Sequence, residues 1–395
     1  MKPADIREKP RAARRMSDIQ PFRVMALLAR ARALEAQGRS IIHMEIGEPD
    51  FPTPQPIIDA GIRALQQGNI YYTPALGLPQ LREAIAAFYL ERYGIGVSPA
   101  RIIVTPGASG ALLLALGILI NPGEKVLMSD PGYPCNRHFV RLFEGIPVGI
   151  GTDAATGYQL TSDLIAKYWD AETAAAMVAS PANPTGTLVE PENLRLIVEK
   201  VQALRGRLIA DEIYHGLVYQ GQAATALSFS DDVFVINSFS KYFGMTGWRL
   251  GWLVAPESCL HDADKLAQNI FLAASTPAQY AALAAFRPDT ISNLEQRRAE
   301  FQRRRDYLLP ALRNIGLNVP IVPNGAFYLY ADCSRYTDDS ETFAREILER
   351  AGVAITPGAD FGSHKAKRHL RLAYTTSLEN LKEGVHRLEN FLHKH

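Results

Sequence analysis

The segment SFSKYFGMTGWRLGW, residues 238–252, places Lys241 and Arg249 eight positions apart between two apolar runs. The run VFVI before it and the run GWLV at its end predict two strands that are joined by a glycine-containing turn. Strand-like runs that end in turn residues, with helical patterns between them, recur through the first two thirds of the chain. They cover 101–107, 125–134, 176–186, 207–214, 233–241 and 247–256. This alternation predicts a mostly parallel sheet between helices, with any ligand at the carboxyl ends of the strands.

The length of 395 residues predicts two domains. We expect a large cofactor-binding domain at 46–290 and a smaller α+β domain from 16–45 and 291–395. Residues 1–15 are expected to form a solvated N-terminal arm. The charged pattern of 288–313 predicts a long helix, whose arginine run at 297–305 we interpret as an exposed face.

Composition excludes several classes of function. A net charge of +1 argues against nucleic-acid binding by bulk electrostatics. The three cysteines contain no CxxC pair, so we expect neither a disulfide framework nor a zinc site, and a reducing compartment. The apolar run at 111–120 is too short to cross a bilayer. We therefore expect a cytoplasmic protein with no metal, membrane or nucleic-acid partner.

Lys241 by itself is most simply a surface lysine, but its neighbours favour another interpretation. A lysine amine can form a Schiff base with a carbonyl group. Ser238 and Ser240 offer hydroxyl groups, and Arg249 offers a charged fork that suits a phosphate. A ligand that suits these residues has both a carbonyl group and a phosphate. Pyridoxal 5'-phosphate has both groups, and we therefore expect it as the cofactor.

That cofactor makes further demands on the chain. Asp211, at the end of a predicted strand, could pair with the ring nitrogen, although an aspartate there is as often a helix cap. Asn183 and Tyr214 could bind the phenolic oxygen, although Asn183 also suits a plain turn. The start of a helix at 107–109 could bind the phosphate. Tyr133 could stack on the ring or could simply belong to the core.

The motifs as a set resemble the class I and II aminotransferases, the pyridoxal-phosphate enzymes of fold type I that include aspartate aminotransferase. The resemblance runs from about Asp18 to the C-terminus. It rests on IGEPDF (46–51), YYTPALGLPQLREAIA (71–86), TPGASGAL (105–112), SDPGYP (129–134), PANPTG (181–186), ADEIY (210–214), SFSKYFGMTGWRLGW (238–252), GAFYLY (325–330) and HLRLAY (369–374). It implies a seven-stranded, mostly parallel sheet in the large domain and a homodimer with shared active sites.

The resemblance also implies a role for each site residue. Lys241 would form the Schiff base and move the proton, with Asp211 and Tyr214 as the other catalytic residues. Arg371 would bind the substrate carboxylate, helped by Gly47 and Asn183. The cofactor-binding residues would be Gly107, Ala108, Ser109, Tyr133, Asn183, Asp211, Tyr214, Ser238, Ser240, Lys241, Arg249 and, from the neighbouring subunit, Tyr72.

The implied reaction is transfer of an amino group from an L-amino acid to a 2-oxo acid by a ping-pong mechanism. Ser109 stands where one bacterial aspartate-type subgroup has a lysine, and the segment 19–22 expected over the pocket is mostly apolar. Tyr133 and Phe361 are expected to add apolar surface, so we expect a neutral amino donor or a broad range. Alternatives are an aspartate aminotransferase, or a lyase, decarboxylase or synthase on the same scaffold. A regulator with an attached DNA-binding domain is disfavoured, because few residues precede the matching region.

Overall fold

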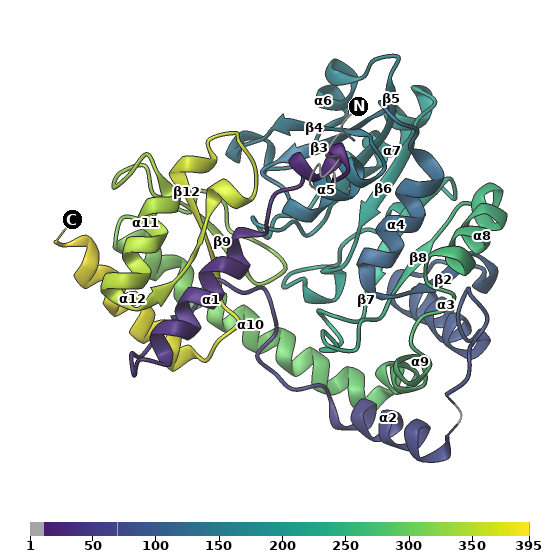
Figure 1. The fold of residues 1–395 in the computed structure, drawn as a ribbon, viewed down its shortest axis with the longest axis horizontal. Helices are drawn as coiled ribbons and strands as arrows, with labels where there is room; N and C mark the ends of the chain where they lie inside the picture. Colours follow the sequence, from purple (N-terminus) through teal and green to yellow (C-terminus); the bar gives the residue numbers. More distant parts are fainter. Residues whose placement is uncertain (1–11, 69, 395) are drawn as a thin grey trace, which may run out of the picture.

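The structure is a computed structural model that describes residues 12–68 and 70–394. Its centre is a sheet of seven strands, which confirms the predicted fold class (Figure 1). Only β8 runs antiparallel to its two neighbours, and the other pairs are parallel. In spatial order the strands are β2 (Ile102–Thr105), β8 (Gly251–Val254), β7 (Val233–Ser238), β6 (Arg207–Asp211), β5 (Thr173–Ala179), β3 (Lys125–Asp130) and β4 (Ile146–Gly151).

Both faces of this sheet are covered by helices, which is why its strands read as nearly continuous apolar runs. In β6, Leu208 and Ala210 pack into one apolar cluster, whereas Ile209 packs into the other. The first face is covered by α3 (Pro79–Tyr93), α6 (Ser162–Tyr168), α7 (Pro191–Ala203) and α9 (Thr276–Leu283). The second is covered by α4 (Gly107–Leu119), α5 (Pro134–Leu142) and α8 (Leu260–Ile270). Helix α2 (Gln55–Gln67) packs on α9.

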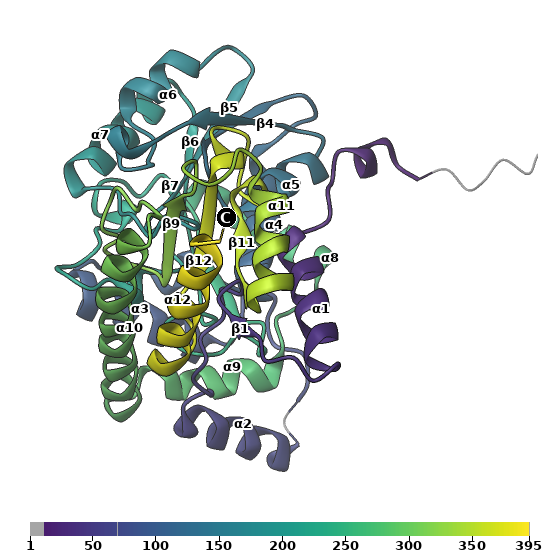
Figure 2. The same cartoon turned by 90° about the vertical axis from the view of Figure 1, so that its left-hand side faces the viewer.

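A second group of elements combines the two ends of the chain (Figures 1 and 2). It contains an antiparallel sheet in the order β11-β12-β9 and a short parallel pair of β1 with β10. The strands are β1 (Ile42–His43), β9 (Tyr328–Asp332), β10 (Val353–Ala354), β11 (Thr356–Pro357) and β12 (His369–Ala373). The helices are α1 (Arg23–Glu35), α11 (Ser340–Glu346) and α12 (Leu378–Leu392). The domain boundaries expected at residues 46 and 290 stay a prediction.

Helix α10 (Pro288–Asn314) corrects the expectation of a solvated arginine face. Arg304 and Arg305 are buried, with 4% and 3% of their surface exposed. The Arg304 guanidinium donates to the Asp50 carboxylate at 2.8 Å and lies over the Phe51 ring. The apolar side chains of Phe301 and Leu308 lie one turn to either side of Arg304, so the arginine belongs to the packed face.

The segment before α1 includes a short 3-10 helix, η1 (Arg14–Ser17), in which Arg15 pairs with Glu144 at 3.1 Å. The rest of the expected N-terminal arm, residues 1–11, lies outside the described residues. Among the helices of the described chain, none is long and apolar enough to cross a membrane.

Candidate active site

A cavity of about 240 Å³ lies at the carboxyl ends of β6 and β7 and at the start of α4. This is the edge of a parallel sheet at which ligands are expected to bind. The cavity brings together most of the predicted site residues. Those that line it are Gly47, Ala108, Ser109, Tyr133, Asn183, Asp211, Tyr214, Ser238, Ser240, Lys241, Arg249 and Arg371. Gly107 does not line the cavity but lies against the Arg249 side chain, and Tyr72 lies in a separate recess.

Lys241 follows the end of β7 and projects its amine into this cavity. The Nζ atom donates to the carbonyl oxygen of Gly47 at 2.7 Å. Removal from water lowers the pKa of Lys241 to about 8, and the nearby cations Arg371 and Arg249 act in the same direction. Glu48 opposes this shift. The amine can therefore lose its proton near neutral pH, which a nucleophilic or basic lysine needs.

Asp211 is the last residue of β6, and its carboxylate accepts the backbone N–H of Ile213 at 3.2 Å. Burial raises the pKa of Asp211 to about 6, while that N–H group and the charge of Lys241 oppose the increase. The next carboxylate, Glu212, does not line the cavity and accepts the Thr225 hydroxyl at 2.9 Å. Of these two neighbouring carboxylates, Asp211 is therefore the one that faces the cavity.

The start of α4 forms an end of the cavity that suits an anion. Gly107 has a φ of +69°, and a Cβ atom there would lie 2.8 Å from Nη2 of Arg249. A side chain at this left-handed position would be strained and would displace the guanidinium, so glycine favours its contact with the first turn of the helix, whose N–H groups have no partner within the helix. The Ser238 hydroxyl donates instead to the carbonyl of Leu250 at 3.2 Å, so it supports the loop backbone in this structure.

Arg371, on β12, is a buried cation with no ion-pair partner among the described residues. Its Nη1 donates to Oδ1 of Asn183 at 3.1 Å, and its Nη2 donates to the Thr356 hydroxyl at 3.1 Å. The Nε atom is buried without a hydrogen-bond partner in the described chain. Because burial of an unpaired charge is costly, this guanidinium is suited to bind a carboxylate that enters the cavity.

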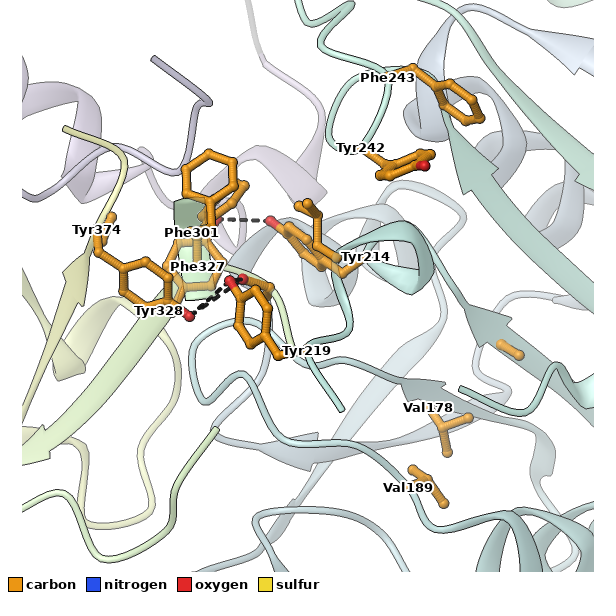
Figure 3. Packing of buried hydrophobic residues seen from close by; sticks show 14 of the residues in the cluster. Val178, Val189, Tyr214, Tyr219, Tyr242, Phe243, Phe301, Phe327, Tyr328 and Tyr374 are labelled. Atoms are coloured by element: carbon orange, nitrogen blue, oxygen red, sulfur yellow. Dashed lines mark hydrogen bonds between the residues drawn. The ribbon is translucent and has the colours of Figure 1, made fainter. Parts of the chain in front are cut away.

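Tyr328, on β9, is a site residue that the sequence interpretation missed. Its hydroxyl and that of Tyr214 lie 2.8 Å apart, and the two side chains point toward each other in Figure 3. The Arg371 guanidinium carbon lies 4.5 Å from the centre of the Tyr328 ring. The sequence motif GAFYLY includes Tyr328. Strand β9 pairs with β12, and because alternate residues of paired strands share a face, Tyr328 lies on the same face as Arg371.

Part of the cavity lining is apolar, and this apolar wall includes the first turn of α1. Its side chains come from α1, α4 and α5 and the segment before α1: Phe22, Val24, Met25, Leu112 and Phe139. Of the segment 19–22 that was expected over the pocket, only Phe22 is among the described lining residues. Phe361 does not line the cavity but packs 4.8 Å from the Arg371 guanidinium carbon. Among the described lining residues, the lysines and arginines are only Lys241, Arg249 and Arg371.

Tyr72 is 83% exposed and lies in a separate recess beside Thr276 and Pro277. It therefore makes no contribution to the cavity of its own chain. Its expected contact with the phosphate site of a second subunit stays a prediction.

The family model for aminotransferase class I and II matches residues 39–388. A (5-formylfuran-3-yl)methyl phosphate transaminase from Methanocaldococcus jannaschii is 38% identical, with 97% of this chain and 100% of the relative covered. A valine–pyruvate aminotransferase from Mycobacterium tuberculosis is 38% identical, with 95% and 97% covered. The crystal structure of an aminotransferase from Mycobacterium tuberculosis superposes with a TM-score of 0.94 at 37% identity, covering 98% of this chain and 100% of that chain. The fold, the cavity and these matches show that the chain belongs to the class I and II aminotransferase family.

Proposed function

We propose that the protein is a pyridoxal 5'-phosphate-dependent aminotransferase that moves an amino group from a neutral L-amino acid to a 2-oxo acid. The observation that carries this proposal is the meeting of three groups in one cavity: the Lys241 amine, the Asp211 carboxylate and the unpaired Arg371 guanidinium. The valine–pyruvate relative supports a neutral donor. Other relatives are named aspartate aminotransferases, so a dicarboxylate amino donor is the second candidate.

The residues present fit this cofactor. The close approach of Arg249 to the bare backbone of Gly107 leaves a cradle for the phosphate at 107–109, with Ser240 beside it. Asp211 would hold the ring nitrogen, Asn183 and Tyr214 the phenolic oxygen, and Tyr133 a face of the ring. The bound cofactor supplies an electron sink for the negative charge that develops on the substrate α-carbon.

The chain's own residues supply binding and proton transfer. Arg371 binds the α-carboxylate and so fixes which bond to the α-carbon faces Lys241. The Lys241 amine, with its pKa lowered to about 8, takes the α-proton on Nζ and later returns it. Asp211 keeps its negative charge above about pH 6, where it favours a protonated ring nitrogen.

The apolar wall supports the neutral donor. A second carboxylate in the substrate would face Phe22, Met25 and Phe139 with no further cation among the described lining residues. Burial of an unpaired carboxylate against such a surface is unfavourable by several kcal/mol, on the order of the penalties measured for buried charges. We further propose a homodimer in which Tyr72 completes the phosphate site of the other subunit. The cytoplasmic location stays a prediction.

A panel of amino donors with 2-oxoglutarate or pyruvate tests this function. We expect alanine or valine to exceed aspartate in kcat/KM, and an amino acid alone to convert the cofactor to its aminated form. Lys241→Ala is expected to remove turnover, while Lys265→Ala, which changes a lysine outside the cavity, should retain it. A preference for aspartate over alanine of about a hundredfold, or roughly 2.7 kcal/mol, would overturn the neutral donor. Product formation without the aminated cofactor would favour a lyase, decarboxylase or synthase.

A further inference from the structure

The loop of residues 358–361 makes three contacts near the cavity: one with the lining residue Arg371, and two with backbone groups next to other lining residues. It consists of the short helix η9 (Gly358–Asp360) and Phe361. The Phe361 carbonyl accepts the N–H of Gly132 at 2.9 Å, beside Tyr133, and the Phe361 ring packs on Arg371. The third contact is made by the Asp360 side chain. This loop therefore joins the residues that bind the substrate carboxylate to the apolar wall.

Asp360 acts as a distant cap for α1. The N-cap residue of this helix is Phe22, whose side chain cannot accept a hydrogen bond. The cap is supplied by Asp360, whose Oδ1 accepts the backbone N–H of Arg23 at 3.2 Å. Burial raises the pKa of Asp360, while the N–H groups of Arg23 and Val24 and the charges of Arg371 and Arg23 oppose this increase. Only 4% of the Asp360 surface is exposed, so water competes little for this contact.

The turn that Asp360 caps carries part of the cavity wall. Phe22, Val24 and Met25 line the cavity from this turn and the residue before it. The Phe22 ring meets the Tyr133 ring edge to face, with centroids 6.1 Å apart. These side chains keep their places only while the first turn of α1 stays against the cavity.

We propose that Asp360 is a positioning residue that sets the preference for the donor side chain by holding the first turn of α1 over the cavity. The proposal rests on the aminotransferase function proposed above and deepens it. The donors favoured by this contact are neutral amino acids with bulky aliphatic or aromatic side chains. Alanine, whose side chain is a single methyl group, gains little from the wall.

Kinetics of Asp360→Ala and Asp360→Asn with leucine and with alanine as donors test this role. We expect Asp360→Ala to lower kcat/KM for leucine by about fivefold or more relative to alanine, mainly through KM, since loss of a cap loosens the turn. Asp360→Asn keeps an oxygen for the Arg23 N–H and should fall between Asp360→Ala and the wild type. Equal losses for both donors, or no loss, would overturn the proposal.

A matched control and a second measurement separate this role from general damage. Thr161 caps α6 by accepting the N–H of Leu164 at 3.2 Å, and it does not line the cavity. Thr161→Ala should leave the leucine-to-alanine ratio unchanged. Hydrogen exchange of the cofactor-free protein should be faster at residues 23–27 in Asp360→Ala than in wild type, and unchanged exchange there would contradict the capping role. If the wild-type protein transaminates no donor, the proposed function is wrong. Hydrogen exchange at residues 23–27 still tests whether Asp360 caps α1 in that case.

Discussion

Asp211 and Glu212 are neighbours in sequence, but their carboxylates have different surroundings. The Asp211 side chain turns into the cavity, and the Glu212 side chain is held by Thr225 and the backbone of Ala226. Burial raises the pKa of both, to about 6 for Asp211 and to about 8 for Glu212. Both donors to Glu212 reach Oε1, and its Oε2 has no hydrogen-bond partner in the described chain, whereas the Asp211 carboxylate faces the cavity, where a ligand cation could pair with it.

The raised pKa of Asp211 predicts that Asp211→Asn stabilises the cofactor-free protein. The pKa of Asp211 is about 6 in the folded chain and ordinarily 3.8. The folded state therefore binds the proton more tightly, and the free energy of unfolding falls as pH rises through this window. At pH 7 the substitution should raise that free energy by roughly 1–3 kcal/mol, and the gain should vanish below about pH 4.

Thermal unfolding of the cofactor-free variant and wild type at pH 7 and pH 4 measures the effect. Turnover of the loaded variant should be strongly reduced, because an amide cannot favour a protonated ring nitrogen as a carboxylate does. A variant that is less stable than wild type at pH 7 would show that the Asp211 charge is already compensated within the chain.

At the scale of the element, α10 links two segments that carry site residues. Arg304 bonds to Asp50, three residues after Gly47, and its Nη1 lies 3.4 Å from the carbonyl oxygen of Tyr374, three residues after Arg371. One guanidinium thus fixes both segments to the same turn of the helix. The charge run suggested solvent exposure, but the spacing of Phe301, Arg304 and Leu308 on one helical face carried the opposite signal.

Arg304→Met is expected to lower the free energy of unfolding by about 2–4 kcal/mol, because it leaves Asp50 without its charged partner. Arg303→Met is the matched control on the same helix. Arg303 shares Glu300 with Arg304, but 61% of its side chain is exposed. Its loss should change stability by no more than about 0.5 kcal/mol. Denaturant unfolding of the two variants compares them directly, and equal effects would contradict the buried role of Arg304.

The strands of the large sheet and the location of the site at its carboxyl edge could be predicted, since apolar runs ending in turn residues are local signals. Asp211 ends such a run, Lys241 and Arg249 lie in the turn after another, and all three line the cavity. Tyr328 and Asp360 were missed, because their roles depend on contacts with residues that are distant in sequence. The two-residue strands β1, β10 and β11 are too short to leave a periodic pattern.

At the scale of the whole molecule, the exposed Tyr72 predicts an assembly. Its side chain is 83% exposed beside the exposed Tyr71 and Ile70, an unusual surface for an isolated chain. Sedimentation should give about twice the chain mass of 43.5 kDa. A monomer that is fully active would contradict the shared site.

Hybrids of Lys241→Ala and Tyr72→Phe subunits test the sharing itself. In a mixed dimer, one site combines the intact Lys241 of one chain with the intact Tyr72 of the other, so activity should return toward half of the wild-type value. The two variants measured separately give the baseline. Hybrids with no more activity than the sum of these baselines would place Tyr72 outside the neighbouring site.

The apolar wall begins in the first turn of α1, whereas Lys241, Asp211 and the 107–109 turn come from the central sheet and its loops. This separation has an evolutionary consequence. Mutations at residues 22–25, or in the loop that caps them, can shift the range of accepted substrates without disturbing the residues that handle the cofactor. A lineage can then diversify its metabolic roles through a few positions near its N-terminus while the chemistry is inherited intact.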